Sequence, residues 1–188
     1  MKRVYIIHGW DGHPDEGWFP WLKKGLEKRG FHVEIPAMPE SAEPKIEAWV
    51  SYLSDTVGSV DENTFFVGHS IGCQTILRYF EKLPRSSVVG GAFFVAGWFT
   101  LNLKTDEEIK IARPWLSIPI DFEKIKKHTA RFFCVFSDDD EDVPISNLEL
   151  FQKNLGAKCI IEHNKGHFCE SDGVMKLPII LHEILAKS

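Results

Sequence analysis

The stretch "TFFVGHSIG", residues 64–72, decides how the rest of the chain is interpreted. Its first half is a run of β-branched and aromatic residues typical of a buried strand, and helical periodicity begins at Ile71. Ser70 stands between the two, with Gly68 and Gly72 two positions away on either side. The sequence G-x-S-x-G at a strand-to-helix junction is typical of a tight turn that presents a serine. We therefore interpret Ser70 as a candidate nucleophile.

Ser70 also has a purely structural interpretation, as the N-cap of a helix over 71–83. The strand–turn–helix context favours the nucleophile, because this is the setting in which the motif has chemical meaning. A serine hydroxyl is a weak nucleophile and needs a base, so the rest of the chain has to supply one. His69 is not expected to be that base, since adjacent residues in a tight turn diverge and its ring should point into the scaffold.

Short apolar runs alternate with segments of helical periodicity along the chain. The runs cover 3–9, 32–36, 64–70, 88–97, 130–137 and 157–163. The helical segments cover 19–29, 44–58, 71–83, 121–128, 146–155 and 174–187. This alternation predicts an α/β fold, with a parallel sheet of about six strands and helices on both faces. Ligands of such sheets bind at the carboxyl ends of the strands, so the residues after each strand are the functional candidates.

Length and composition exclude several classes of protein. The 188 residues suffice for a single domain, 1–188, with a sizeable core. A net charge of −5 without a basic patch argues against a nucleic-acid partner. No apolar run is long enough to cross a bilayer, so no membrane partner is expected. The four cysteines are scattered and the first residues do not form a secretory signal, so we expect a cytoplasmic protein with free thiols.

Two histidines follow the last predicted strand, in "HNKGHFCESDG", residues 163–173. His167 is the better candidate for the base, because a loop preceded by glycine can carry an imidazole over the edge of the sheet. His163 remains the alternative, and its simpler interpretation is a side chain that closes the strand. Cys169 is a nucleophile in principle, but no tight turn presents it.

Acyl transfer also needs backbone N–H groups directed at the developing oxyanion. One of them usually comes from the residue after the nucleophile, which here is Ile71. The second is expected from the loop after the first strand, "HGWDGHP", in which Trp10 follows His8 and Gly9. A simple turn at the end of the strand explains His8 and Gly9 equally well.

The stretch "SDDDEDVP", residues 137–144, follows the fifth predicted strand and has three interpretations. As a calcium loop it would take its ligands from Asp138, Asp140, Asp142 and Glu149. That interpretation is weak, because Val143 stands where such a loop needs glycine and because Ser146 and Glu149 fit a capping box. A solvated charge run is the second interpretation. The third is that one carboxylate orients the histidine, since the order Ser, Asp, His is that of a hydrolase triad. No metal and no cofactor are predicted.

Together these motifs resemble the α/β-hydrolases, and more closely the retinoblastoma-binding protein 9 family of small serine hydrolases. The likeness runs through "IIHGWDG", "FVGHSIGC", "ARPW", the D-D-x-x-V-P loop and "KGHFCESDG", over nearly the whole chain. It implies Ser70 as nucleophile, Asp140 as acid and His167 as base. It also implies a compact fold without the first antiparallel strands of larger hydrolases and without a large lid. The L-x-C-x-E motif associated with retinoblastoma binding does not occur in this chain, so that partner is not implied.

Asp139 is the alternative to Asp140 as the acid. Asp140 precedes Val143 and Pro144 by the spacing of the D-x-x-V-P form of this fold's acid loop. In that arrangement Val143 packs down as an anchor while Asp140 turns over the sheet toward His167. The remaining acids of the stretch are expected to be solvated: Asp138, Glu141 and Asp142.

The connection over 98–120 is short and rich in large apolar residues. We expect it to form a minimal cap over a small pocket lined by Trp98 and Trp115, although core packing explains Trp115 equally well. The expected function is hydrolysis of a small-molecule ester, thioester or amide through an acyl-enzyme, by a monomer or a weak dimer. One alternative is a non-catalytic protein-interaction module that retains the fold, and another is haloperoxidase-like chemistry that does not use Ser70.

Overall fold

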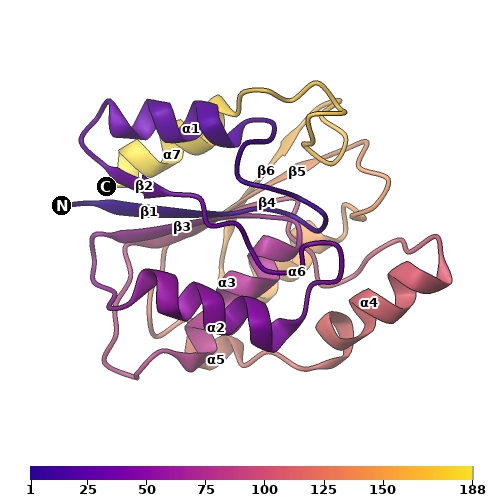
Figure 1. The fold of residues 1–188 in the computed structure, drawn as a ribbon, viewed down its shortest axis with the longest axis horizontal. Coiled ribbons are helices and arrows are strands. Elements are labelled where there is room, and N and C mark those ends of the chain that lie inside the picture. Colours follow the sequence, from indigo (N-terminus) through magenta and orange to yellow (C-terminus); the bar gives the residue numbers. More distant parts are fainter. Residues whose placement is uncertain (188) are drawn as a thin grey trace.

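The computed structural model describes residues 1–187, and a sheet of six parallel strands forms its centre (Figure 1). The strands are β1 (Arg3–Ile7), β2 (His32–Glu34), β3 (Thr64–His69), β4 (Gly91–Val95), β5 (Phe132–Ser137) and β6 (Lys158–Glu162). Their order in the sheet is β2-β1-β3-β4-β5-β6, so the direction of winding reverses between β1 and β3. In open parallel sheets, ligands bind outside the carboxyl ends of the strands at this reversal.

Helices cover both faces of the sheet, as the alternating sequence pattern predicts. They are α1 (Phe19–Glu27), α2 (Ile46–Val57), α3 (Ile71–Lys82), α4 (Asp106–Ser117), α5 (Phe122–Ile125), α6 (Asn147–Leu155) and α7 (Pro178–Lys187). Figure 1 shows α1 and α7 on one face and α2, α3, α5 and α6 on the other. None of the helices described is both long and apolar enough to cross a membrane.

Each face of the sheet has its own hydrophobic core. Strands β3 and β5 are buried at every position, which is why their sequences are apolar without alternation. On one face they pack against the apolar stripe of α2, in which Trp49, Val50 and Leu53 are fully buried. On the other face α1 and α7 contribute a second cluster that includes Leu22 and Ile180. With helices packed on both faces, the residues after the strands at the sheet edge are left to face solvent or ligand.

The structure differs from the sequence-based expectation at two helices. Helix α4 is not predicted by the sequence pattern, and it begins with a capping box in which Thr105 accepts from the Glu108 amide and Glu108 accepts from the Thr105 amide. The capping box expected at Ser146 is wrong, because the Ser146 side chain makes no capping hydrogen bond and its backbone is already helical. Ser146 therefore cannot turn its hydroxyl back toward the first amides of α6.

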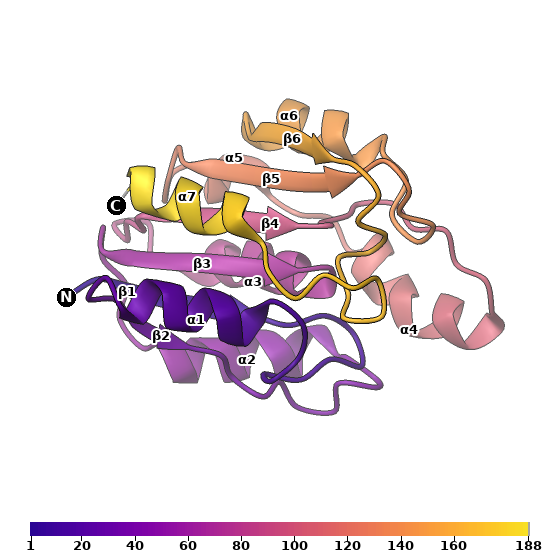
Figure 2. The ribbon, with the colours of Figure 1, turned by 90° about the horizontal axis from the view of Figure 1, so that it is seen from above.

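Helix α4 lies beyond the carboxyl ends of the strands, on the side toward which the strand arrows point (Figure 2). Both chain ends lie on the opposite side of the molecule (Figures 1 and 2). Only Ala112 and Trp115 of this helix are buried. The connection between β4 and α5 thus contains a helix that overhangs the functional edge of the sheet.

Candidate active site

Ser70 occupies a strained turn between β3 and α3. Its φ of 52° and ψ of −119° are unusual for a residue with a side chain. The flanking glycines allow the turn, because a Cβ on Gly72 would collide with the Ile7 carbonyl oxygen and one on Gly68 would lie 2.7 Å from the Cys73 amide nitrogen. The Ser70 side chain makes no N-cap hydrogen bond to α3, so the structure does not support the purely structural interpretation of this serine.

A cavity of about 710 Å³ opens above Ser70 at the carboxyl edge of the sheet. On the sheet side it is lined by Ser70, Ile71, Trp98 and His167, which follow three different strands. On the other side it is lined by residues between Leu101 and Ile111, which lead into α4 or belong to it. This volume is in the range of sites that enclose small organic molecules.

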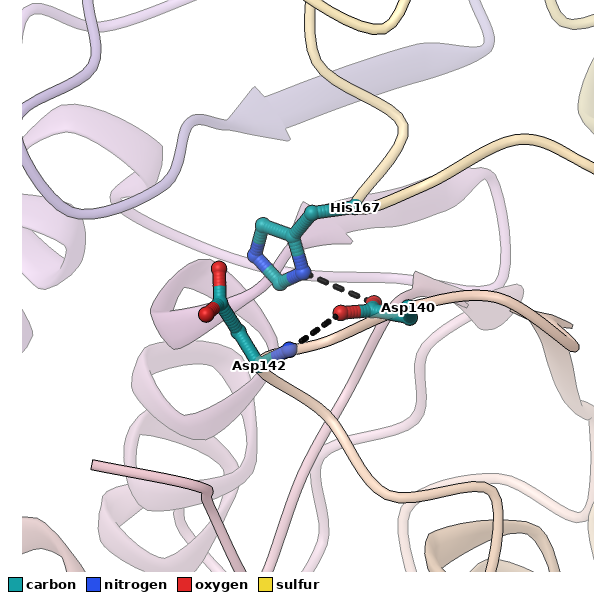
Figure 3. A group of neighbouring side chains, drawn as sticks. All are labelled: Asp140, Asp142 and His167. Atoms are coloured by element: carbon teal, nitrogen blue, oxygen red, sulfur yellow. Dashed lines mark hydrogen bonds and ion pairs between the residues drawn. The ribbon is translucent and has the colours of Figure 1, made fainter. Parts of the chain in front are cut away.

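His167 is held by Asp140 inside this edge of the sheet. Its Nδ1 lies 2.8 Å from Asp140 Oδ2, and a dashed line marks this contact in Figure 3. The second oxygen of Asp140 accepts the backbone N–H groups of Asp142 and Val143, each at 2.9 Å. The Asp140 carboxylate is 2% exposed, and an ionised carboxylate only accepts hydrogen bonds, so this contact favours the imidazole tautomer with the hydrogen on Nδ1 and Nε2 as acceptor. Val143 is buried beneath the loop, in the anchoring position that the D-x-x-V-P spacing predicts.

Ser70 and His167 line the same cavity without a hydrogen bond between their side chains in the described structure. The Ser70 hydroxyl instead accepts from Trp98 Nε1, at 3.4 Å. Hydrogen bonds between a nucleophile and its base are often long in the absence of substrate and tighten when it binds. The sequence-predicted nucleophile, base and acid are therefore brought to one place, with the base and acid already in contact.

Asp139, the alternative acid, has a different task. Its Oδ1 accepts the Ser137 hydroxyl at 2.6 Å and the backbone amides of Lys165 and Gly166 at 3.0 and 2.9 Å. These hydrogen bonds, with that of Ser137 first, keep the pKa of Asp139 below its ordinary value. Asp139 therefore fixes the loop that carries His167 rather than the imidazole itself.

The remaining acids and the alternative base lie outside the cavity or at its rim. His163 is exposed and binds Asp138, with 2.5 Å between Nδ1 and Oδ2, so it does not approach Ser70. Asp138 is consequently engaged by a side chain and is not a freely solvated charge as expected. Asp142 and Glu141 both pair with Lys104, which belongs to the segment before α4.

One carboxylate oxygen each of Asp140 and Asp142 and one ring nitrogen of His167 lie within 4.8 Å of one another. Their present partners do not suit a metal site, because both Asp140 oxygens already accept hydrogen bonds and Asp142 pairs with Lys104 at 2.9 Å. Asp138, which the calcium-loop interpretation also requires, turns instead toward His163. The geometry of the acidic stretch is thus that of a hydrogen-bonded support for the histidine loop.

Trp10 and Ile71, whose amides are the predicted oxyanion donors, both line the cavity next to Ser70. Ile71 is the first residue of α3, so its amide has no acceptor within the helix. The Trp10 indole donates to the Ala42 carbonyl at 2.9 Å, which fixes this side chain. In the described part of the chain no acceptor is found for the Trp10 amide. The buried His8 holds the same turn by contacts to the Gly9 carbonyl and the Met38 amide.

The two predicted pocket tryptophans have different positions. Trp98 lines the cavity, as expected. Trp115 does not line it, so this prediction is wrong. Its indole donates to the Pro44 carbonyl at 2.9 Å, packs edge-on against Trp49 and receives the Arg78 guanidinium on its face. Trp115 therefore belongs to the core and ties α4 to the body of the protein.

A family model described as Serine hydrolase matches residues 4–186. The chain belongs to the serine hydrolase family. It is 36% identical over 180 residues to YdeN of Bacillus subtilis, a protein named as a hydrolase, with 95% of this chain and 92% of the relative covered. Serine hydrolase RBBP9 of Rattus norvegicus is 28% identical over 153 residues, with 81% and 78% covered. The resemblance to small serine hydrolases drawn from the sequence motifs is confirmed.

Solved structures confirm the α/β-hydrolase fold of this serine hydrolase. The crystal structure of the ydeN gene product from B. subtilis has a TM-score of 0.90 and 32% identity, with 100% of this chain and 98% of that chain covered. Est1E from Butyrivibrio proteoclasticus, solved with ferulic acid bound, has a TM-score of 0.73 and 16% identity, with 98% and 90% covered. At that identity the second likeness concerns the fold alone.

Several cavity groups of the serine hydrolase are not found by sequence reasoning. Glu16 comes from the loop before α1, and burial, the main cause, raises its pKa. Cys169, which the sequence analysis considers only as a nucleophile, also lines the cavity, and burial raises the pKa of its thiol to about 12, so it stays protonated at neutral pH. Glu107 and Ile111 come from α4. The capping sequence "TDEE" (105–108) is the feature of the sequence that could have predicted the start of α4 on this side of the cavity.

Proposed function

We propose that this serine hydrolase cleaves small esters, thioesters or amides through an acyl-enzyme formed on Ser70. The observation that carries the proposal is the 2.8 Å contact between His167 Nδ1 and Asp140 Oδ2, beside the cavity that Ser70 and His167 share. This contact leaves Nε2 of His167 without a proton and therefore able to act as a base.

In the proposed reaction, His167 Nε2 takes the proton of the Ser70 hydroxyl as Oγ attacks the carbonyl carbon of the substrate. The carbonyl oxygen becomes an oxyanion, which the N–H groups of Trp10 and Ile71 stabilise. Collapse of the tetrahedral intermediate breaks the bond to the leaving group, which receives the proton from His167. Water then repeats the sequence on the acyl-enzyme, releases the acid and restores Ser70. Asp140 stabilises the imidazolium in both halves.

The charges around the cavity favour an uncharged or cationic substrate. Five lining residues carry carboxylates and none is a lysine or arginine: Asp11, Glu16, Glu107, Glu108 and Asp142. Three of these are already engaged or partly buried, since Glu108 caps α4, Asp142 pairs with Lys104, and Glu16 lies 3.9 Å from His13 and has a pKa raised by burial. The exposed Asp11 and Glu107 still oppose a phosphate-bearing acyl carrier, because like charges at a concave surface repel. Among thioesters, we therefore expect uncharged ones to react faster than anionic ones.

The proposal is tested with a fluorophosphonate probe, whose phosphorus mimics the attacked carbonyl carbon. Mass spectrometry should place the adduct on Ser70, and Ser70→Ala should abolish labelling and lower turnover of p-nitrophenyl acetate by several orders of magnitude. The exposed Ser171 provides the matched control, because Ser171→Ala should label like the natural protein. Labelling at another residue, or full activity of Ser70→Ala, would overturn the proposal.

A further inference from the structure

His69, the residue before Ser70, is buried between the nucleophile turn and the histidine loop. It is 4% exposed and packs edge-on against the rings of Trp18 and Phe19. Its Nε2 lies 2.7 Å from the backbone carbonyl oxygen of His167, and the two imidazole rings lie 5.0 Å apart between centroids. The proposed reaction gives this side chain no role.

The contact fixes the proton of the His69 ring. A carbonyl oxygen only accepts, so Nε2 carries the hydrogen and Nδ1 is left without one. Nδ1 is itself buried and has no partner among the described residues. A second proton would therefore be an unpaired buried charge, and burial is the main reason that the pKa of His69 falls to about 3. The ring is a neutral donor over the whole range in which a hydrolase works.

We propose that His69 is a positioning residue, whose Nε2–H bond to the His167 carbonyl sets the place of the His167 imidazole relative to Ser70. The inference rests on the proposed function, because it assigns His167 as the base. The peptide bond that joins His69 to Ser70 and the hydrogen bond that joins its ring to His167 make one short link between nucleophile and base.

The hydrogen bond from His69 adds to those with which Asp139 holds the amides of Lys165 and Gly166, on the other side of His167. Gly166 and Phe168 both have positive φ, at 52° and 58°, so the loop is held in a conformation that a side-chain-bearing residue rarely adopts. The Trp18 indole donates to the Phe168 carbonyl at 3.1 Å, next to the carbonyl that His69 holds. Trp18 thus binds the residue after the proposed base. His69 binds His167 itself and is also the chain neighbour of Ser70. A displacement of the base by about 1 Å costs on the order of 100-fold in rate.

The chain offers a matched control in His128, which lies at the amino-terminal edge of the sheet between α5 and β5. His128 is 1% exposed, its Nδ1 lies 2.9 Å from the Ser87 carbonyl oxygen, and its other ring nitrogen is buried without a described partner. The two histidines therefore share burial and bonding pattern. They differ in that only His69 touches the candidate site.

The experiment compares His69→Phe, His69→Gln and His128→Phe. His69→Phe removes the donor and should lower kcat for p-nitrophenyl acetate by about 10- to 100-fold with little change in KM, because the base is misplaced and binding is not. His69→Gln retains an N–H donor of similar reach and should recover kcat to within about threefold of the natural protein. His128→Phe should lose thermal stability comparably and keep its kcat.

A normal kcat for His69→Phe, or equal kcat losses for His69→Phe and His128→Phe, would overturn the inference. If the natural protein is labelled at Ser70 but these outcomes occur, the proposed function stands and only the role of His69 fails.

A measurement on the natural protein tests the hydrogen bond of the His69 ring even if His69→Phe does not fold. Nitrogen-15 NMR of the imidazole rings should show His69 as the Nε2–H tautomer and without titration between pH 5 and pH 9. The titratable groups that face it are His8, Asp140 and His167, and those that share the small cavity at its side are Glu16, Cys169 and Glu170. A protonation step of His69 in that range, or the Nδ1–H tautomer, would contradict the proposed hydrogen bond.

Discussion

The cavity has two walls of different construction. The sheet-edge wall carries Ser70 and His167 on short turns after strands, where close-packed glycines and buried hydrogen bonds fix each position. The α4 wall carries Glu107 and Ile111 on a helix of which only Ala112 and Trp115 are buried. The proposed reacting groups thus lie where close contacts and hydrogen bonds hold the backbone, and the groups that would meet the rest of a substrate lie on an overhanging helix. We expect changes in the first wall to lower turnover and changes in the second to alter selectivity.

The sharpest test of the sheet-edge wall is Asp140→Asn. The amide retains the shape of the carboxylate but no longer favours the Nδ1–H tautomer or supports an imidazolium. We therefore expect kcat to fall by about 10⁴-fold, as it does when the aspartate of a serine protease triad is changed to asparagine. The fold should persist, because the amide oxygen still accepts the Asp142 and Val143 amides. Steady-state kinetics and a melting curve measure the two effects.

Asp139→Asn is the control for that prediction. Its amide oxygen can keep the hydrogen bonds from Lys165 and Gly166, so most of the activity should remain. If Asp139→Asn were the inactive variant and Asp140→Asn nearly normal, the assignment of the acid would be wrong by one residue. Restoration of activity in either variant by calcium would instead support the metal interpretation.

The sheet-edge wall is largely predictable from the sequence, and the reason is local. Ser70 directly follows the buried strand β3, and His167 lies in the loop after β6. A parallel sheet brings the ends of its strands to one edge, so the two residues are expected close together without any knowledge of distant packing. The choice of Asp140 over Asp139 depends on the D-x-x-V-P spacing, and the structure places only Asp140 against the imidazole.

The α4 wall is not predictable in the same way. A helix with Ala112 and Trp115 as its only buried residues shows no apolar stripe, and Pro114 within it argues against a helix. Large apolar residues in a connection suggest a roof, and the sequence alone therefore does not decide between a place in the pocket and a place in the core for Trp115. In fact, its partners Pro44 and Trp49 come from a segment far away in sequence, and only the tertiary structure brings them together.

The second test of the sheet-edge wall is the Trp10 amide. Trp10→Pro removes the N–H, and loss of one oxyanion donor lowers turnover by about 100- to 1000-fold. Trp10→Phe retains the N–H and loses only the indole contact to Ala42, so it should keep most of its activity. Circular dichroism has to show that Trp10→Pro is folded. A folded, fully active Trp10→Pro would place the second donor elsewhere.

Acid pH should lower the free energy of unfolding of the protein, because His69 and His8 at this edge of the sheet are buried. Burial lowers the pKa of His69 to about 3 and also lowers that of His8, whereas an unfolded histidine titrates near the ordinary 6.5. As the pH falls below 6.5, these histidines become protonated in the unfolded chain, whereas in the folded chain burial keeps them neutral. The free energy of unfolding should therefore be greatest above about pH 6.5 and fall toward about pH 3, by at most about 1.4 kcal/mol per pH unit for each such group.

Urea unfolding at pH 7, 6 and 5 measures that fall. His69→Gln should show a shallower decline than the natural protein, because one of the groups that resists protonation is gone. His32→Gln removes an exposed histidine on β2 and should leave the slope unchanged. Equal slopes for all three proteins would mean that His69 is not held neutral by burial.

The smallest effect is expected at the α4 wall, and it concerns selectivity. Glu107 and Asp106 are adjacent, exposed carboxylates in the first turn of α4, but only Glu107 lines the cavity. The ester acetylcholine and its uncharged isostere 3,3-dimethylbutyl acetate differ in charge and hardly in shape. Across water, a charge pair some 6 Å apart is worth about 0.7 kcal/mol, so Glu107→Gln should lower the choline preference in kcat/KM by about threefold. Asp106→Asn makes the same change in net charge and helix dipole and should leave the preference as it is. If both variants changed it equally, the general field of the protein would be selecting the substrate, and the α4 wall would not contribute to specificity through direct contact.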